Sequence, residues 1–131
     1  MFFAAKIANT VSALRVGFIA KHRYVKIRVS KYTTTILNKL QVVGLIETFY
    51  IQTIGFKKYA IITLAYIDGR PAYSKIKLIS KPSKRYYISW RATQTLINSG
   101  AVIIISTSLG ILTAEEALLK RVGGEVLLLL E

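Results

Sequence analysis

The chain has 131 residues and a mass of 14.7 kDa, is 53% hydrophobic and carries a formal net charge of +13. This hydrophobic content is enough for a folded core and excludes wholesale disorder, and the absence of cysteine excludes disulfide frameworks, cysteine-based zinc sites and thiol catalysis. The longest apolar runs have about five residues, whereas a helix that spans a bilayer needs roughly 20, so no transmembrane helix is predicted.

The positive charge is concentrated in the first two thirds of the chain. Residues 1–91 contain 17 lysines and arginines against two acids, a net charge of +15, whereas residues 92–131 carry a net charge of −2. A basic face that only contacts solvent normally contains interspersed acids. The imbalance therefore predicts an anionic partner, which is either a nucleic acid or an acidic membrane surface.

The first half of the chain predicts two helices and several strands. Apolar residues recur at three- and four-residue steps from Phe3 to Phe18, which predicts an amphipathic helix. Residues 24–29 alternate apolar and basic side chains, as a half-buried strand does. Ser30 is the expected N-cap of a second helix that runs to Val43. Further strands are expected at 46–53, 59–67 and 73–80, with a turn at 68–71.

The last third predicts short helices that alternate with buried strands. Helices are expected from Ser89 to Ser99 and, opened by a capping box of Thr113 and Glu116, from there to Val122. Strands are expected at 101–106 and 125–130, and Gly123 and Gly124 are expected to serve the turn before the last strand.

This order of elements predicts an α+β fold of two small packed lobes. The basic loop 81–85 marks the expected boundary between them. An N-terminal αβαβββ lobe takes residues 1–80, and a β-rich C-terminal lobe with short helices takes residues 81–131.

The expected strand 101–106 ends in three hydroxyl residues followed closely by a glycine. Ser106, Thr107 and Ser108 can each donate and accept hydrogen bonds, and Gly110 lets a backbone approach a ligand closely. Such a tip suits a surface of phosphates, 2′-hydroxyls and base edges. Because serine, threonine and glycine are also common in ordinary turns, these residues alone leave both interpretations open.

Three blocks of the sequence resemble the ribosomal protein S-eight family, whose members bind ribosomal RNA directly. The strongest block is 105–113, followed about ten residues later by Gly123-Gly124-Glu125. The others are Ser80-Lys81-Pro82 with Arg85 and Tyr87, and the segment 8–17 with Leu14-Arg15-x-Gly17, while Ser30-Lys31 falls where the family starts its second helix with a basic residue. The chain departs from the family pattern at Ala13, Val16 and Leu109 and in the short region 56–58.

The resemblance implies a set of RNA-binding residues. Ser106, Thr107, Ser108 and Gly110 would lie against the minor groove of a distorted RNA helix, where proteins contact 2′-hydroxyls and exposed bases. Lys81 and Arg85 would contact phosphates. Tyr87 would stack or hydrogen-bond, or else serve as half-buried structure. Glu125 would accept from a base amino group or orient the hydroxyl residues. The resemblance adds Arg15, Ser30 and Lys31.

The implied function is that of a small-subunit ribosomal protein that binds the central rRNA domain and supports its folding and assembly. Its expected partners are this rRNA and neighbouring small-subunit proteins, without a membrane, a small-molecule substrate, a cofactor or a metal. The many isoleucines and the departures favour a mitochondrial ribosome, with a plastid or a bacterial cytoplasm as alternatives.

Three other classes of function fit the sequence less well than a ribosomal protein does. An enzyme is not expected, because His22 is the only histidine and no acid lies near it in the sequence. A basic protein that binds anionic membrane surfaces through its first helix is the main alternative. A general binder of single strands would need an aromatic stacking face, and the eight tyrosines show no such pattern along the sequence.

Overall fold

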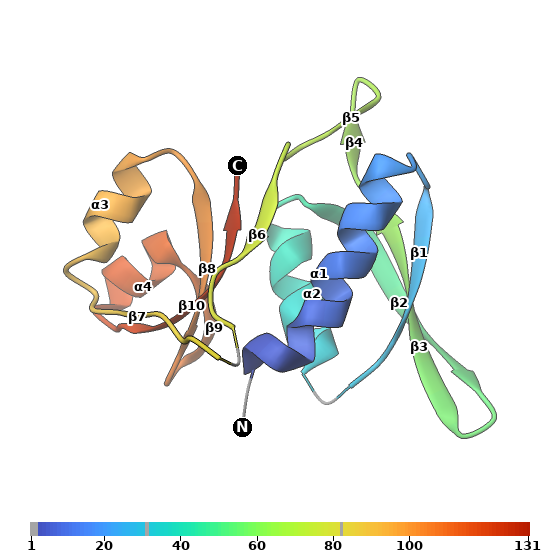
Figure 1. Ribbon diagram of the computed structural model, residues 1–131, viewed down its shortest axis with the longest axis horizontal. Helices are drawn as coiled ribbons and strands as arrows, with labels where there is room; N and C mark the ends of the chain where they lie inside the picture. The colour runs from blue at the N-terminus through green and yellow to red at the C-terminus, as the bar shows by residue number, and fades with distance from the viewer. Residues whose placement is uncertain (1–2, 31, 82) are drawn as a thin grey trace. The chain divides into compact units, whose positions relative to one another are not determined.

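The computed structural model describes residues 3–30, 32–81 and 83–131, and it forms two compact units (Figure 1). One unit comprises residues 6–72, and the other comprises residues 73–131 together with residues 3–5. Both combine helices with antiparallel strands, so the predicted α+β class with two lobes is confirmed. None of the helices in the described ranges is long and apolar enough to cross a membrane.

The unit of residues 6–72 has two helices on one side of a three-stranded antiparallel sheet (Figure 1). The strand order is β1-β3-β2, and the paired residues include Ile27 with Ala60 and Ile61 with Tyr50. The elements are α1 (Phe3–Ile19), β1 (Tyr24–Arg28), α2 (Thr33–Val42), β2 (Ile46–Ile54), β3 (Lys57–Leu64), β4 (Tyr66–Ile67) and β5 (Arg70–Pro71).

The core of this unit contains the apolar stripes that the sequence predicts. The fully buried side chains come from both helices and from the sheet: Ile7, Leu14, Ile36, Leu37, Leu40, Ile46 and Ile62. The helix α1 approaches the sheet closely at Gly17, where a Cβ atom would lie within 3.0 Å of Val25 Cγ2. A glycine at this point therefore allows the helix to lie directly on β1.

The unit of residues 73–131 contains a second antiparallel sheet of order β6-β10-β8-β9, with β7 also paired to β10. Its core cluster is Ile103, Ile105, Leu112, Ala114, Ala117 and Val126. The elements are β6 (Ile76–Leu78), β7 (Tyr87–Ile88), α3 (Thr93–Asn98), β8 (Val102–Thr107), β9 (Gly110–Thr113), α4 (Ala114–Lys120) and β10 (Gly124–Leu130).

Two features of this unit differ from the elements expected from the sequence. Residues 73–80 group with the C-terminal unit, because β6 pairs with β10 through Leu78 with Leu128 and Ile76 with Leu130. The strands β7 and β9 were not expected, since each is too short to show a period of its own.

The first residues of the helices show which of the expected N-caps form. The capping box of Thr113 and Glu116 is confirmed, with both of its reciprocal hydrogen bonds at 3.2 Å. Ser30 is not the N-cap of α2, which is Tyr32 without a side-chain cap. The Ser30 N–H instead donates to Thr33 Oγ1 at 2.9 Å, so the threonine at the first helical position satisfies the backbone. The α3 helix likewise starts at Thr93, later than the expected Ser89.

Candidate nucleic-acid interface

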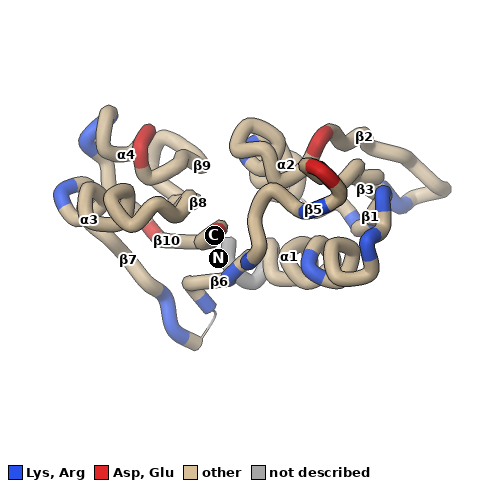
Figure 2. Tube along the Cα trace, turned by 90° about the horizontal axis from the view of Figure 1, so that it is seen from above, with Lys and Arg blue, Asp and Glu red and all other residues tan. Residues whose placement is uncertain are grey.

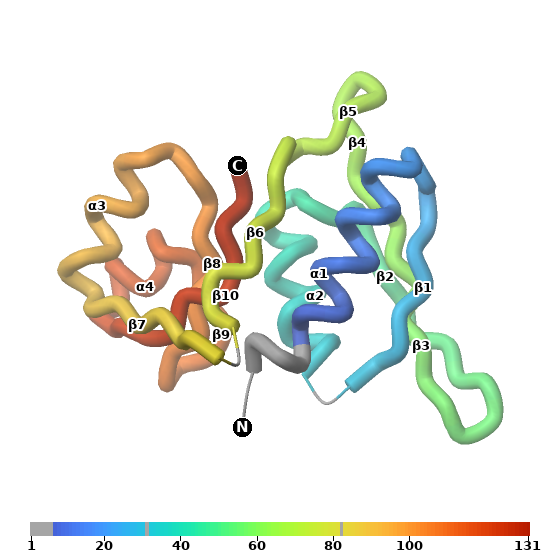
Figure 3. The backbone as a smooth tube through the Cα atoms, in the orientation of Figure 1, coloured from blue at the N-terminus to red at the C-terminus, as the bar shows by residue number. Residues whose placement is uncertain are grey.

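The hydroxyl residues lie at the tip of the β8–β9 hairpin (Figure 3). Ser106 and Thr107 are the last two residues of β8, and Thr107 pairs with Gly110 across a two-residue turn of Ser108 and Leu109. Gly110 has a φ of 115°, a conformation that favours glycine. The side chains of Ser108 and Leu109 are exposed at the turn.

The three hydroxyls have different surroundings. Thr107 Oγ1 donates to the Gly110 carbonyl at 2.8 Å and accepts from the Leu109 N–H at 3.1 Å. Its single hydroxyl hydrogen is therefore used inside the hairpin. Successive residues of a strand point to opposite faces, so Ser106 lies on the other face of the sheet from Thr107. The Thr107 side chain closes the hairpin, while Ser106 is half-buried on the opposite face of the sheet and Ser108 is exposed at the turn.

The sheet brings together three of the residues that the sequence marks as RNA-binding. Glu125 of β10 pairs with Ser106 of β8 on one side and with Tyr87 of β7 on the other. Residues that lie directly opposite in antiparallel strands share a face, with Cβ atoms about 5 Å apart. Tyr87, Glu125 and Ser106 thus form a row across three strands, which we call the Tyr–Glu–Ser row.

Glu125 occupies the middle of this row with one oxygen in an unusual environment. Its Oε2 atom is buried and has no hydrogen-bond partner within the described part of the chain. The neighbouring Tyr87 is 65% exposed, so the row is open at the side of β7. A buried carboxylate oxygen without a donor is costly, and an N–H or O–H group that enters at this side would satisfy it.

Two glycines allow the three strands of this row to approach one another closely. A Cβ on Gly124 would lie under 3.0 Å from the backbone carbonyl oxygen of Ser106, and one on Gly123 would also lie under 3.0 Å from that of Ile88. Neither glycine has a positive φ, and Gly124 is the first residue of β10. Gly123 lies in the connection that precedes the last strand, as expected, whereas Gly124 belongs to the strand itself. The lack of a side chain at both positions allows β10 to lie against β7 and β8.

The basic loop is tied to the same strands. Lys81 and Lys84 exchange two backbone hydrogen bonds, of 2.8 and 3.0 Å, which make a tight turn with both side chains exposed. Ser80 Oγ is fully buried and bonds both the N–H and the carbonyl of Tyr86. That carbonyl also accepts from the Val126 N–H at 2.8 Å, so the loop is anchored beside the Tyr–Glu–Ser row. Arg85 is half-buried.

The remaining predicted residues belong to the other unit. Arg15 is exposed on α1, and the Ser30 hydroxyl lies 2.8 Å from the Thr33 hydroxyl. Lys31, like Pro82 of the basic loop, lies outside the described residues. These positions therefore belong to a different unit from the β8–β9 hairpin.

One basic cluster in the C-terminal unit was not expected from the sequence. The guanidinium carbons of Arg91 and Arg121 lie 5.3 and 5.8 Å from the ring centroid of Trp90, which is a cation–π arrangement on both. Arg121 follows α4 with a φ of 55°. The adjacent Trp90 and Arg91 could have been noticed in the sequence. The contact of Arg121 with the same ring could not, because it depends on where α4 ends.

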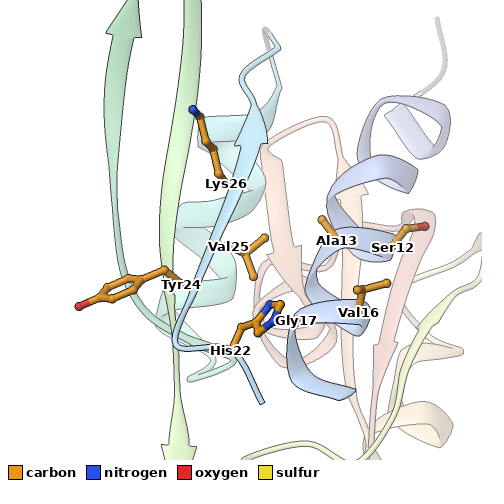
Figure 4. A pocket seen from close by; sticks show the side chains of 8 residues that line it. All are labelled: Ser12, Ala13, Val16, Gly17, His22, Tyr24, Val25 and Lys26. Carbon is orange, nitrogen blue, oxygen red and sulfur yellow. The ribbon is translucent and has the colours of Figure 1, made fainter. Parts of the chain in front are cut away.

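A hollow of about 400 Å³ lies between α1 and β1 in the other unit (Figure 4). Its lining includes Val16, Val25, His22 and Lys26 and is mostly apolar. None of the described residues that line it is acidic, so His22 lacks there the carboxylate partner that a catalytic histidine normally has.

Comparisons with known proteins match almost the whole chain. Residues 5–130 match the family model of ribosomal protein S8. The small ribosomal subunit protein uS8 of Vesicomyosocius okutanii is 34% identical over 127 residues, which cover 97% of each chain. The corresponding uS8m of Acanthamoeba castellanii is 35% identical over 93% of this chain and 95% of its own.

A third relative, uS8 of Legionella pneumophila (strain Lens), is 39% identical over 123 residues, which cover 92% of each chain. The match thus includes the helices of the first unit as well as the hairpin and the Tyr–Glu–Ser row of the second. The chain belongs to the ribosomal protein S8 family.

Proposed function

We propose that this protein is a structural, non-catalytic component of the small ribosomal subunit and binds the central domain of small-subunit rRNA directly. The names of its relatives, which are small ribosomal subunit proteins, support the first part. The second part rests on the Oε2 atom of Glu125, which is buried between Ser106 and Tyr87 and finds no hydrogen-bond partner among the residues that the structure describes.

In this proposal the tip of the C-terminal unit recognises the RNA. Ser106 and Ser108 offer hydroxyls that both donate and accept, as 2′-hydroxyls and base edges require. Glu125 Oε2 accepts a hydrogen bond from a base amino group or a 2′-hydroxyl. A carboxylate contributes to specificity here because it repels phosphates. Glu125 therefore favours only those positions of the RNA in which a hydrogen-bond donor faces it.

Basic side chains position the RNA against this tip. Lys81 and Arg85 contact phosphates beside the Tyr–Glu–Ser row, and such contacts fix orientation without carrying sequence information. The unit of residues 6–72 contains eleven lysines and arginines against Glu47 and Asp68, and it attracts the RNA over a longer range. Arg15, Ser30 and Lys31 are the proposed contacts of that unit.

We place the ribosome in a mitochondrion. The support is the isoleucine-rich composition and the similarity to uS8m of Acanthamoeba castellanii. Fractionation of the source cells tests this placement, since the protein should then sediment with mitochondrial small subunits and its neighbouring ribosomal proteins.

The test of RNA recognition is Glu125→Gln, which keeps the shape of the side chain, removes its charge and turns one of its two acceptor oxygens into an NH2 donor. A hydrogen bond to a charged group is worth about 1.5–3 kcal/mol, which corresponds to a loss of roughly tenfold to 150-fold in affinity. This loss is expected for a central-domain rRNA fragment and not for an unrelated RNA of equal length, as measured by filter binding.

The matched control is Glu115→Gln on the exposed side of α4, which changes the net charge by the same amount. It should leave the preference for the rRNA fragment unchanged. Equal effects of the two substitutions, or a folded Glu125→Gln protein with the original preference, would contradict the proposed contact.

A further inference from the structure

The sheet of the first unit has one face that no helix covers. Side chains alternate between the two faces of a strand. On the face towards the helices, Ile27, Ala60 and Ile62 are buried. Figure 4 shows the alternation on β1, where Val25 points towards Gly17 of α1 and Tyr24 points away from the helix.

The outer face carries aromatic and basic side chains side by side. Lys26 pairs with Ile61, which in turn pairs with Tyr50, so these three form one row across β1, β3 and β2. The next row is Arg28, Tyr59 and Gln52, and the row on the other side begins with Tyr24. Three of the eight tyrosines, which show no pattern along the sequence, thus lie on one face.

Two of these tyrosines are exposed, and cations lie beside two of the three rings. The guanidinium carbon of Arg23 is 5.7 Å from the centroid of the Tyr24 ring, so a base would stack on the other side of that ring. Tyr24 is 57% exposed and Tyr50 is 58% exposed, so neither belongs to the buried core. The Lys26 ammonium lies 4.5 Å from the centroid of the half-buried Tyr59 ring, which places its charge on the outer face. From the strand spacing and the rise per residue, Tyr24 and Tyr50 are about 12 Å apart with Lys26 in the row of Tyr50.

The charge around this face is strongly positive. Lys26 and Arg28 are exposed on β1, and Lys57 and Lys58 are exposed where the β2–β3 hairpin turns. Figure 2 shows basic residues along β1 and β3, and the acids of the unit lie near β2 and β5. Glu47, the acid closest to the sheet in sequence, lies at the bulge where β2 begins.

We propose that this outer face is a second RNA-binding surface, which takes unpaired nucleotides by stacking their bases on Tyr24 and Tyr50. Lys26 and Arg28 would then contact the phosphates between the stacked bases. Proteins that bind single strands combine aromatic platforms with a positive surface in this way. The surface is separate from the β8–β9 hairpin, and its activity does not depend on the contact proposed for Glu125.

The chemistry of the face favours an unpaired strand over a duplex or a protein. In a duplex the bases are already stacked on one another, so exposed rings gain nothing from them. A protein surface that docks on this face would need an acidic patch opposite Lys26 and Arg28. RNA provides both the π-faces and the negative charge along one strand.

The test uses the full-length protein and a labelled oligouridylate of about 12 nucleotides, a length in the usual range for such sites. Tyr24→Ala and Tyr50→Ala should each weaken its binding about tenfold, in line with the cost of losing one stacked base. Tyr24→Phe and Tyr50→Phe keep the ring and should bind within about twofold of the original protein. Fluorescence anisotropy measures all five proteins.

Two controls separate this surface from the hairpin and from unspecific effects. Leu119→Ala removes a side chain that is 84% exposed on α4 and should leave oligouridylate binding unchanged. Glu115→Gln, exposed on the same helix, should also leave it unchanged. Because the contact proposed for Glu125 is tested with the rRNA fragment and not with oligouridylate, a failure of the hairpin proposal does not affect this result. Oligouridylate binding that survives both tyrosine-to-alanine substitutions, or that falls equally in the phenylalanine variants, overturns the proposal. Unchanged binding combined with loss of assembly into small subunits would identify a protein-docking face instead, and would also overturn it.

Discussion

At the scale of single residues, the three adjacent hydroxyl residues of the hairpin have different roles. They look equivalent in the sequence, but Thr107 uses its hydrogen on the Gly110 carbonyl and accepts from the Leu109 N–H. Ser106 and Ser108 have no such role in closing the turn. A substitution of all three would therefore mix a structural effect with an effect on recognition.

The substitution Thr107→Val separates these effects, because it keeps the shape of the side chain and removes the hydroxyl. Two intramolecular hydrogen bonds are lost, each worth about 0.5–1.5 kcal/mol. We expect the free energy of unfolding to fall by about 1–3 kcal/mol, as measured by urea denaturation. Thr107→Ser should restore most of the loss.

Ser108→Ala is the matched control for this prediction, since the residue is exposed at the same turn. It should leave the unfolding free energy within about 0.5 kcal/mol of the original value. A Thr107→Val protein as stable as the original would show that the two hydrogen bonds do not hold the hairpin.

At the scale of elements, the Tyr–Glu–Ser row depends on how closely three strands pack. Gly124 pairs with Ile88 of β7 and with Thr107 of β8, so it lies in the strand next to Glu125. The carbonyl of Ser106 occupies the space that a Cβ on Gly124 would need. The backbone of one strand thereby sets the position of a recognition residue on its neighbour.

We predict that Gly124→Ala pushes β8 away from β10 at Ser106. Overpacking of this kind typically costs about 1–3 kcal/mol of stability. Because Ser106 and Glu125 are then displaced from each other, affinity for the rRNA fragment should fall more than affinity for unrelated RNA. Thermal unfolding and filter binding measure the two effects.

Gly100→Ala is the control for this substitution. Gly100 has a φ of 83° and nothing within 4 Å of its missing Cβ, so alanine strains only the local backbone. It should lower stability without changing the preference for the rRNA fragment. The steric explanation fails if both alanine variants keep that preference.

At the scale of the whole molecule, the net charge of +13 governs how the protein approaches a polyanion. Each phosphate contact releases condensed counterions, so the logarithm of the binding constant falls linearly with the logarithm of the salt concentration. The eleven lysines and arginines of residues 6–72 and the basic loop 81–85 both contribute.

We predict a steep loss of RNA affinity between low and moderate salt. Replacing Lys81 and Arg85 together by glutamine should reduce the slope of this plot by about 1–2 and weaken binding to rRNA and unrelated RNA alike. Glu125→Gln, which removes no cation, should keep the original slope. An affinity that does not change with salt would contradict the role assigned to charge.

The local part of the structure could be predicted from the sequence because it depends on neighbouring residues. The capping box of Thr113 and Glu116 forms as expected, since both partners lie within one helical turn. The apolar stripe of α1 buries Ile7, Val11 and Leu14 as its spacing indicates. Ser30 was wrongly expected to cap α2, because its hydroxyl lies 2.8 Å from the Thr33 hydroxyl and the helix starts only at Thr33.

By itself, the sequence determined the α+β class, the hydroxyl motif, the excess of positive charge and, through the resemblance of its motifs, the family. Only the tertiary structure decided which distant residues meet: Tyr87, Glu125 and Ser106 across three strands, and Tyr24 with Tyr50 on the outer face of another sheet. The physical reason is that strand pairing joins residues far apart in the chain. Its register sets which side chains share a face, and a shift of one residue would reverse it.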